Sequence, residues 1–251
     1  ISHEQLIDLT LNSIVGAGFT LDREHYSSCR EGNVANAKFT IKNVSDPEMQ
    51  LQIAFQNSYD KSLSLKYALG FHVFICSNGG VSGDMGAFKK KHQGTIQEFT
   101  PVTITEYIKR AGDVFRQIQK EREEMKQIQI NKRTQAELIG RALIEEEFIT
   151  STQMNIIAKQ LYAPDFDYNC KGSMWELYQF FTQSMKDIHP TLWMENHIKA
   201  HKFFVNESGI FTPSTSIVVP DPGSHPQLDL YETQNRFEIE ETFRLNNNVV
   251  G

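Results

Sequence analysis

The chain has 251 residues, of which 39% are hydrophobic and 22% are charged, so it can bury the core of a globular protein. It contains no run of 18 apolar residues, and its first residues lack the basic start and apolar run of a signal peptide, which argues against a membrane-spanning or secreted protein. Three widely separated cysteines, Cys29, Cys76 and Cys170, indicate neither a disulfide framework nor a CxxC metal pair, and a reducing cytoplasm is expected.

The net charge of −6 is unevenly distributed along the chain. Residues 206–251 contain seven acidic and two basic residues, a net charge of −5, so the preceding part is close to neutral at −1. An acidic chain is a poor general binder of nucleic acid, but a nearly neutral body leaves room for a local basic patch.

The predicted elements begin with a helix over residues 3–15, where apolar residues recur at helical spacing and glycines follow. Extended segments are then predicted at 19–29, 38–43, 49–57, 71–76 and 94–99. The second and third of these alternate apolar and polar residues, which predicts one buried and one polar face. The fourth, FHVFIC, is apolar on both faces and predicts a central strand with four buried residues: Phe71, Val73, Phe74 and Ile75.

From Thr103 onward the pattern is helical. A 4-3-4-3 spacing of apolar residues predicts one long helix over 104–129, and shorter helices follow at about 135–147, 151–161, 174–187 and 192–204. Five capping boxes, each a Ser or Thr followed three residues later by Glu or Gln, mark predicted helix starts. They are Ser2–Gln5, Thr103–Glu106, Thr134–Glu137, Thr150–Gln153 and Ser173–Glu176.

These elements predict an α+β fold, in which a long helix packs on an antiparallel β-meander and a C-terminal helical cluster and an irregular arm follow. We divide the chain into a sheet domain with the long helix at 1–130, the helical cluster at 131–205 and the irregular acidic arm at 206–251. The apolar seam of the long helix extends beyond the strands, and the arm is rich in apolar residues. We therefore expect a homo-oligomer in which one of the two forms the contact.

No pattern in the chain predicts a catalytic site, a cofactor or a bound metal. His197 and His201 have the i, i+4 spacing of a metal-binding pair but lack a third ligand, so we interpret them as residues of a helix face. Cys76 and His72 have the spacing of a dyad on one strand face, but a buried structural cysteine is the simpler interpretation. Trp193, near the start of a predicted helix, is expected to lie in the core.

Basic residues with few acidic neighbours form the candidate binding surface. Residues 61–92 contain five lysines and a single acidic residue, Asp84, and the polar face of the 38–57 hairpin adds lysines and amides. Such a surface can hold the phosphates of a nucleic acid, although a solvated surface is the simpler alternative. The candidate nucleic-acid-binding residues are Lys38, Lys42, Lys61, Lys66, Lys89, Lys90, Lys91 and His92.

Three segments carry a resemblance to a known family: NSYDKSLSLKYALGFHVFICSNG at 57–79, KKKHQG at 89–94 and MWELYQFFTQSMKDIHPTLWMENHIKAHKFF at 174–204. They combine an Asn-Ser-Tyr-Asp turn, a strand ending in Cys-x-Asn-Gly, a basic step and a late helix with tryptophan. In these features the chain resembles a domain-of-unknown-function family of uncharacterised phage- and plasmid-encoded proteins, over about residues 50–205. The resemblance implies a mobile-element origin and a host cytoplasm, and it assigns no reaction and no catalytic residue.

The order of elements is also similar to that of the single-strand annealing proteins of phage recombination, a likeness of fold class alone. We therefore expect a nucleic-acid-binding protein of a mobile element rather than an enzyme, acting in recombination or strand annealing with single-stranded DNA as its partner. The alternative is a counter-defence protein that inhibits a host immune complex by binding a host defence protein. A continuous basic face would favour the first, and an exposed apolar or acidic surface the second.

Overall fold

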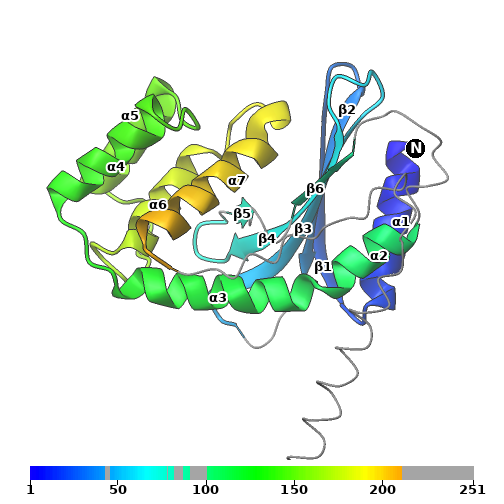
Figure 1. The fold of residues 1–251 in the computed structure, drawn as a ribbon, viewed down its shortest axis with the longest axis horizontal. Coiled ribbons are helices and arrows are strands. Elements are labelled where there is room, and N and C mark those ends of the chain that lie inside the picture. The colour runs from blue at the N-terminus through cyan, green and yellow to red at the C-terminus, as the bar shows by residue number, and fades with distance from the viewer. Residues whose placement is uncertain (43–45, 78, 82–86, 91–100, 211–251) are drawn as a thin grey trace, which may run out of the picture. The chain divides into compact units, whose positions relative to one another are not determined.

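The computed structural model describes residues 1–42, 46–77, 79–81, 87–90 and 101–210. Helix α1 comes first, then strands β1 to β6, then helices α2 to α7 (Figure 1), which confirms the predicted α+β class. The bounds are α1 His3–Gly16, β1 Leu21–Cys29, β2 Val34–Ile41, β3 Met49–Ser58, β4 Leu65–Val73, β5 Gly79–Val81, β6 Ala87–Lys90, α2 Pro101–Lys109, α3 Ala111–Gln127, α4 Lys132–Ile144, α5 Ser151–Tyr162, α6 Met174–Ser184 and α7 Pro190–Glu207. Within these ranges no helix is long and apolar enough to cross a membrane.

Strands β1 to β4 form the predicted antiparallel meander, in which each strand pairs with the next. β4 has two further antiparallel partners, since β5 pairs with its C-terminal end and β6 with its N-terminal end. β1 is an edge strand and most of its side chains are exposed, whereas all ten residues of β3 are buried. The predicted strand at 94–99 lies outside the described residues.

The two faces of the sheet carry different side chains. Cross-strand rows such as Phe39–Ile53–Leu69 are fully buried and make one face apolar. Helix α1 packs on that face, where the Thr10 hydroxyl lies 2.7 Å from the hydroxyl of Tyr67 in β4. In Figure 1 helices α1 and α2 lie on one side of the sheet and α6 and α7 on the other. Removing these apolar rows from water is the main driving force for the fold.

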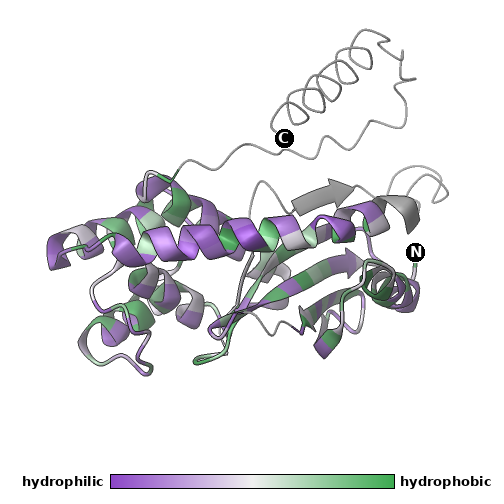
Figure 2. Cartoon of the chain, turned by 90° about the horizontal axis from the view of Figure 1, so that it is seen from below, coloured by the Kyte–Doolittle hydropathy of each residue, from purple (hydrophilic) through white to green (hydrophobic). Residues whose placement is uncertain are grey.

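The long helix predicted at 104–129 is two helices, α2 and α3, and the single-helix prediction is wrong. Arg110 interrupts it, because the amides of Arg110 and Asp113 donate to the carbonyls three residues before them instead of four. The apolar seam nevertheless stays buried across the break, and Figure 2 shows hydrophobic and hydrophilic residues alternating along α3. Ile118 and Met125 are buried within this chain, so they need no second subunit to cover them.

Three of the five predicted helix caps are confirmed. Ser2 and Thr150 form capping boxes, and the Ser173 hydroxyl accepts from the backbone N–H of Glu176. Helix α2 instead begins at a proline, whose fixed φ suits a first helical turn. Helix α4 is capped by Asn131, which precedes the predicted Thr134 and is among the strongest capping residue types.

The prediction of four buried residues at the end of β4 is half wrong. Phe71 and Val73 are buried, but Phe74 is 39% and Ile75 is 49% exposed. β4 ends at Val73 because its partner β3 begins at Met49, the residue opposite. The chain then turns, so the alternation of a strand no longer decides which side chains face inward. Since Phe74 is partly exposed, Phe74→Ala would not leave a core cavity.

An ion pair fastens helix α3 to the turn before β3. The Asp46 carboxylate accepts from Arg122 at 2.9 Å, and it also accepts from Gln119 and from the backbone N–H groups of Glu48 and Met49. Burial opposes ionisation of Asp46, but these hydrogen bonds outweigh it and lower its pKa. The pair is therefore ionised at neutral pH, with both side chains at most 9% exposed.

Asp46→Ala should lower the free energy of unfolding by ~1.5–3 kcal/mol, because it removes the buried acceptor of Arg122, which keeps the more exposed Glu123. It also leaves the backbone N–H groups of Glu48 and Met49 without their acceptor. Guanidinium unfolding at neutral pH measures the effect. Asp113→Ala is the matched control, since Asp113 forms its ion pair with Arg116 on the exposed surface of the same helix, and it should change stability little. Equal effects of the two variants would contradict a stabilising role for the buried Asp46–Arg122 ion pair.

Gly80→Ala should also destabilise the fold, by about 1–3 kcal/mol. A Cβ at Gly80 would lie 2.5 Å from the ring of Phe71 and 2.9 Å from the hydroxyl of Tyr178, both fully buried. Gly140→Ala is the control, because its Cβ would meet nothing within 4 Å and Ala favours a helix interior. The midpoint of thermal unfolding should fall for Gly80→Ala and rise for Gly140→Ala. An unchanged midpoint for Gly80→Ala would show that β5 can shift.

Candidate functional site

Helix α7 covers part of the polar face of the sheet. The Pro190 carbonyl, at the start of α7, accepts hydrogen bonds from Gln56 at 3.0 Å and from Asn36 at 3.2 Å. A small apolar cluster of Ala54, Ala68, Trp193 and Met194 lies beside them. The hairpin face that we expected to meet water or a nucleic-acid backbone is therefore largely buried. Its Gln56 and Asn36 amides bond to α7, and Gln50 donates to Asp22 of β1.

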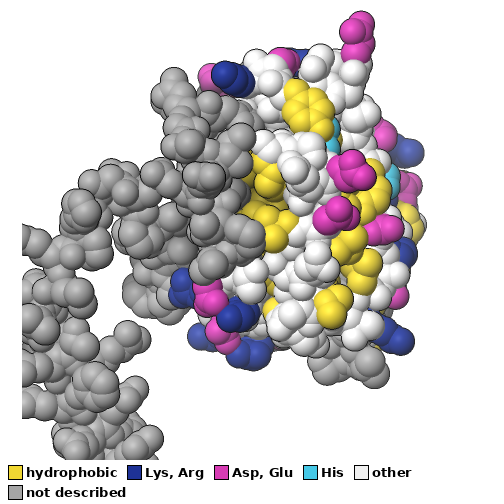
Figure 3. Space-filling model, turned by 90° about the vertical axis from the view of Figure 1, so that its right-hand side faces the viewer, with side chains coloured by type: hydrophobic (Ala, Val, Ile, Leu, Met, Phe, Trp, Pro, Cys, Tyr) yellow, Lys and Arg dark blue, Asp and Glu magenta, His cyan; other side chains and the backbone are white. Residues whose placement is uncertain are grey.

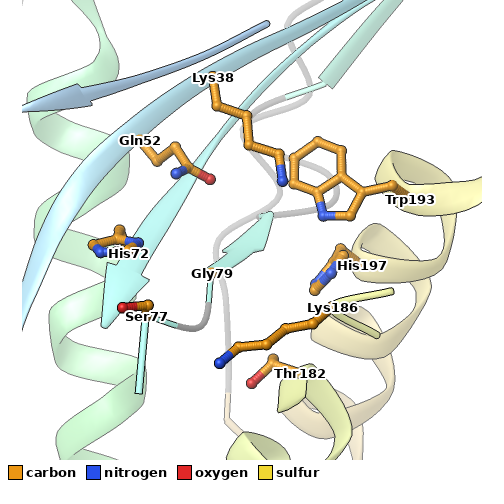
Figure 4. A pocket seen from close by; sticks show the side chains of 9 residues that line it. All are labelled: Lys38, Gln52, His72, Ser77, Gly79, Thr182, Lys186, Trp193 and His197. Carbon is orange, nitrogen blue, oxygen red and sulfur yellow. The ribbon is translucent and has the colours of Figure 1, made fainter. Parts of the chain in front are cut away.

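A pocket of about 330 Å³ opens where the sheet, α6 and α7 meet (Figure 4). Lys38, Gln52 and His72 reach into it from the sheet, and Trp193 and His197 from α7. The described residues that line it are Lys38, Gln52, His72, Ser77, Gly79, Thr182, Lys186, Trp193 and His197. Two of them are lysines and none is acidic, so the lining is cationic and rich in hydrogen-bonding groups.

Lys38 is the deeper of the two lysines. Its Nζ lies 3.8 Å from the centre of the Trp193 ring, a cation–π contact. Burial lowers the pKa of Lys38 to about 8. The ammonium forms no hydrogen bond or ion pair with any residue in the described part of the chain, so its three donors are available to an acceptor in the pocket.

Lys186 stands on the opposite wall, in the segment between α6 and α7. Its Nζ donates to the backbone carbonyl of Cys76 and lies 5.6 Å from the ring of Phe166. Lys186 is exposed, so it marks the mouth of the pocket, whereas Lys38 is half-buried. The carbonyl uses one of the three Lys186 donors and leaves the others for a ligand.

The two histidines of the pocket are neutral at pH 7. Burial, assisted by the charge of Lys38, lowers the pKa of His197 to about 3. Burial first, and then the charges of Arg23 and Lys38, lower the pKa of His72 to about 4, although Asp22 opposes them. His197 is 2% exposed and its Nδ1 has no hydrogen-bond partner among the described residues.

The candidate residues from the sequence lie in several places. Lys38 lines the pocket, and Lys66 on the same sheet face is paired with Glu195 at 3.3 Å. Lys42 and Lys61 are exposed outside the pocket, after β2 and between β3 and β4. Lys89 and Lys90 belong to β6, where Lys89 is in register with Lys66, and their side chains are not described. Lys91 and His92 lie outside the described residues.

His197 and His201, which have the sequence spacing of a metal-binding pair, lie in separate environments. His201 lies 3.2 Å from Glu121 and 3.3 Å from the Tyr178 hydroxyl, whereas His197 faces the pocket. The described residues contain no group of three or more side chains that could hold a metal. The Cys76 and His72 side chains do not share a face, since β4 ends between them and Cys76 belongs to the main core.

Sequence reasoning missed most of the pocket. Lys186, Thr182 and Ser77 were not candidates. Trp193 is buried in a small core cluster, as expected, but its place in the pocket lining was not predicted. The strand alternation did identify Lys38 and Gln52 as polar-face residues. What it could not supply was the position of α7, which turns that face into a pocket wall.

Lys38→Met should stabilise the protein at pH 7, and the gain should shrink as the pH rises. The pKa of Lys38 is about 8 in the fold against an ordinary 10.5, so between these values the unfolded chain binds more protons and the stability of the unmodified protein increases. We expect the difference between the two proteins to change by roughly 1–2 kcal/mol between pH 7 and pH 10, since water at the half-buried site screens the effect.

Urea unfolding of both proteins across this pH range measures that change. Lys109→Met, on the exposed surface of α2, should follow the pH dependence of the unmodified protein. A stability difference for Lys38→Met that does not vary with pH would contradict the burial of this ammonium.

Residues 3–202, from the first residue of α1 into α7, match the family described as a domain of unknown function, DUF932. Neither a curated protein nor a solved structure matches the chain. The match includes every residue that lines the pocket and about four fifths of the sequence. The chain therefore belongs to the DUF932 family.

Proposed function

We propose that this is a phage or plasmid protein that binds single-stranded DNA, and that the strand binds in the pocket between the sheet and α7. The observation that carries the proposal is the charge of the pocket. Lys38 and Lys186 approach from opposite walls, and none of the described lining residues is acidic. Phosphate is the anion that a nucleic acid presents along its whole length, and lysines that neutralise it supply most of the binding free energy.

The face of the molecule that carries α1 supports this location. The side of the molecule on which α1 lies is drawn in Figure 3, where hydrophobic and acidic side chains occupy the centre of the described surface and basic ones lie towards its border. The chain as a whole has a net charge of −6. A polyanion would therefore gain little from the general field of the protein and must bind where cations are concentrated.

A role in recombination or strand annealing belongs to the same proposal. It rests on the order of the strands and helices, and single-stranded DNA is the ligand that such a role requires. Trp193 adds a π-face at the pocket, although Lys38 already contacts the ring. Bases can therefore gain stacking contacts only where the ring is left uncovered.

Fluorescence anisotropy with a labelled single-stranded oligonucleotide tests the proposal. Lys38→Gln and Lys186→Gln should each weaken binding roughly 3- to 10-fold at low salt and reduce the slope of log affinity against log salt by about 1, because each removes one phosphate contact. Glutamine at 186 can still donate to the Cys76 carbonyl. Lys109→Gln removes one positive charge from exposed α2 and should leave both quantities unchanged.

Failure of the unmodified protein to bind single-stranded DNA at low salt would end this proposal. Equal weakening by all three variants would show that binding depends on net charge and not on the pocket.

A host defence protein is a second candidate partner, in line with a counter-defence role. The observation that favours it is the exposure of Phe74 and Ile75, two large apolar side chains next to each other after β4. Exposed apolar residues in a cluster are typical of protein-binding surfaces. Capture of a host protein from infected cells by the unmodified chain, but not by a Phe74→Ser, Ile75→Ser variant, would support this second function.

A further inference from the structure

The pocket contains two positive charges and, among its described lining residues, no negative charge to balance them. Lys38 has no acceptor among the described residues, and Lys186 has only a neutral carbonyl. Asp22 acts on His72 beside Arg23, but its side chain is not part of the pocket lining. A ligand that carries two negative charges would neutralise both lysines, whereas a ligand with one negative charge would neutralise only one of them.

Neutral hydrogen-bonding groups surround the two lysines. His197 lines the pocket and is almost fully buried, and its Nδ1 has no hydrogen-bond partner among the described residues. Gln52 and Ser77 contribute an amide and a hydroxyl (Figure 4). Two cations with neutral donors between them suit a compact group that presents several oxygen acceptors at once.

We propose that this pocket binds a phosphate monoester, the group found at a phosphorylated end of a DNA strand and in a free nucleoside monophosphate. At pH 7 such a group carries a charge of about −1.5 to −2 and presents three terminal oxygens. An internal phosphodiester carries only one negative charge and presents only two terminal oxygens. The strand-end source of this ligand rests on the proposed binding of single-stranded DNA, whereas the free nucleotide does not.

A dianionic ligand of this pocket should bind with a characteristic pH dependence. A bound dianion favours the charged form of Lys38, so affinity should be constant up to about pH 8 and should fall above it as the free protein loses that proton. Affinity should also fall below about pH 6, where the monoester itself takes up a proton. The other charged or titratable groups that face Lys38 or the pocket are Lys186, His72, His197, Arg23 and Asp22.

The experiment compares four probes on the full chain: one oligonucleotide with a 5′-phosphate, with a 3′-phosphate and with neither, and a nucleoside 5′-monophosphate. At least one phosphorylated strand should bind at least 10-fold more tightly than the unphosphorylated strand. This ratio should approach 1 in Lys38→Gln and in Lys186→Gln, and it should persist in Lys109→Gln. Lys186 is exposed, so its variant tests the site even if the half-buried Lys38→Gln were to fold poorly.

The outcomes separate this inference from the proposed function. Equal affinity for all three strands, with binding still lost in the lysine variants, would overturn the monoester site and leave single-stranded DNA binding intact. Binding of the free monophosphate, lost in the lysine variants, with no binding of any strand, would support the monoester site and overturn the proposed function. Binding of neither the phosphorylated strands nor the monophosphate would overturn the inference.

Discussion

One carbonyl oxygen, that of Pro190, fixes helix α7 on the polar face of the sheet. It accepts from the side chains of Gln56 and Asn36, and Gln56 also donates to Asn36 at 2.9 Å, so the two amides align each other. Amides at these sheet positions would be costly to bury without acceptors. The helix start supplies an acceptor, and its position brings Trp193 over Lys38 and places His197 in the wall of the pocket.

Buried polar groups of folded proteins normally have partners. In this pocket the buried Nδ1 of His197 and the ammonium of the half-buried Lys38 have no hydrogen-bond partner among the described residues. The ring of Trp193 stabilises the ammonium by about 1–2 kcal/mol, but it offers no hydrogen-bond acceptor atom. Departures of this kind concentrate at functional sites, where a ligand supplies the missing groups. A phosphate group would supply acceptors to both lysines.

The walls of the pocket are tied to the far side of the molecule through buried polar contacts. Glu121 of α3 lies 3.2 Å from His201 of α7, and His201 lies 3.3 Å from the hydroxyl of Tyr178 in α6. The next residue of α3, Arg122, binds Asp46 before β3. Helix α3 therefore connects the helices of the pocket with the sheet, so the two walls are parts of one packed unit instead of two that can slide independently.

Local sequence determined much of the fold. The alternation in residues 38–43 and 49–57 predicted the paired strands and their two faces, and the caps at Ser2, Thr150 and Ser173 predicted three helix starts. Such signals succeed because a strand face or a helix cap depends on residues close together in the chain. The same alternation identified Lys38 as a polar-face residue, and this was the part of the pocket that could be predicted.

Tertiary structure alone decided what that face does. Lys38 and Trp193 meet only because α7 returns to the sheet, and no periodicity connects residues so far apart in sequence. The exposure of Phe74 was likewise decided by where the partner strand begins. The different environments of His197 and His201 were decided by the groups that surround each side chain. Local pattern specifies which residues share a face, whereas burial, charge and unsatisfied donors depend on what that face meets in space.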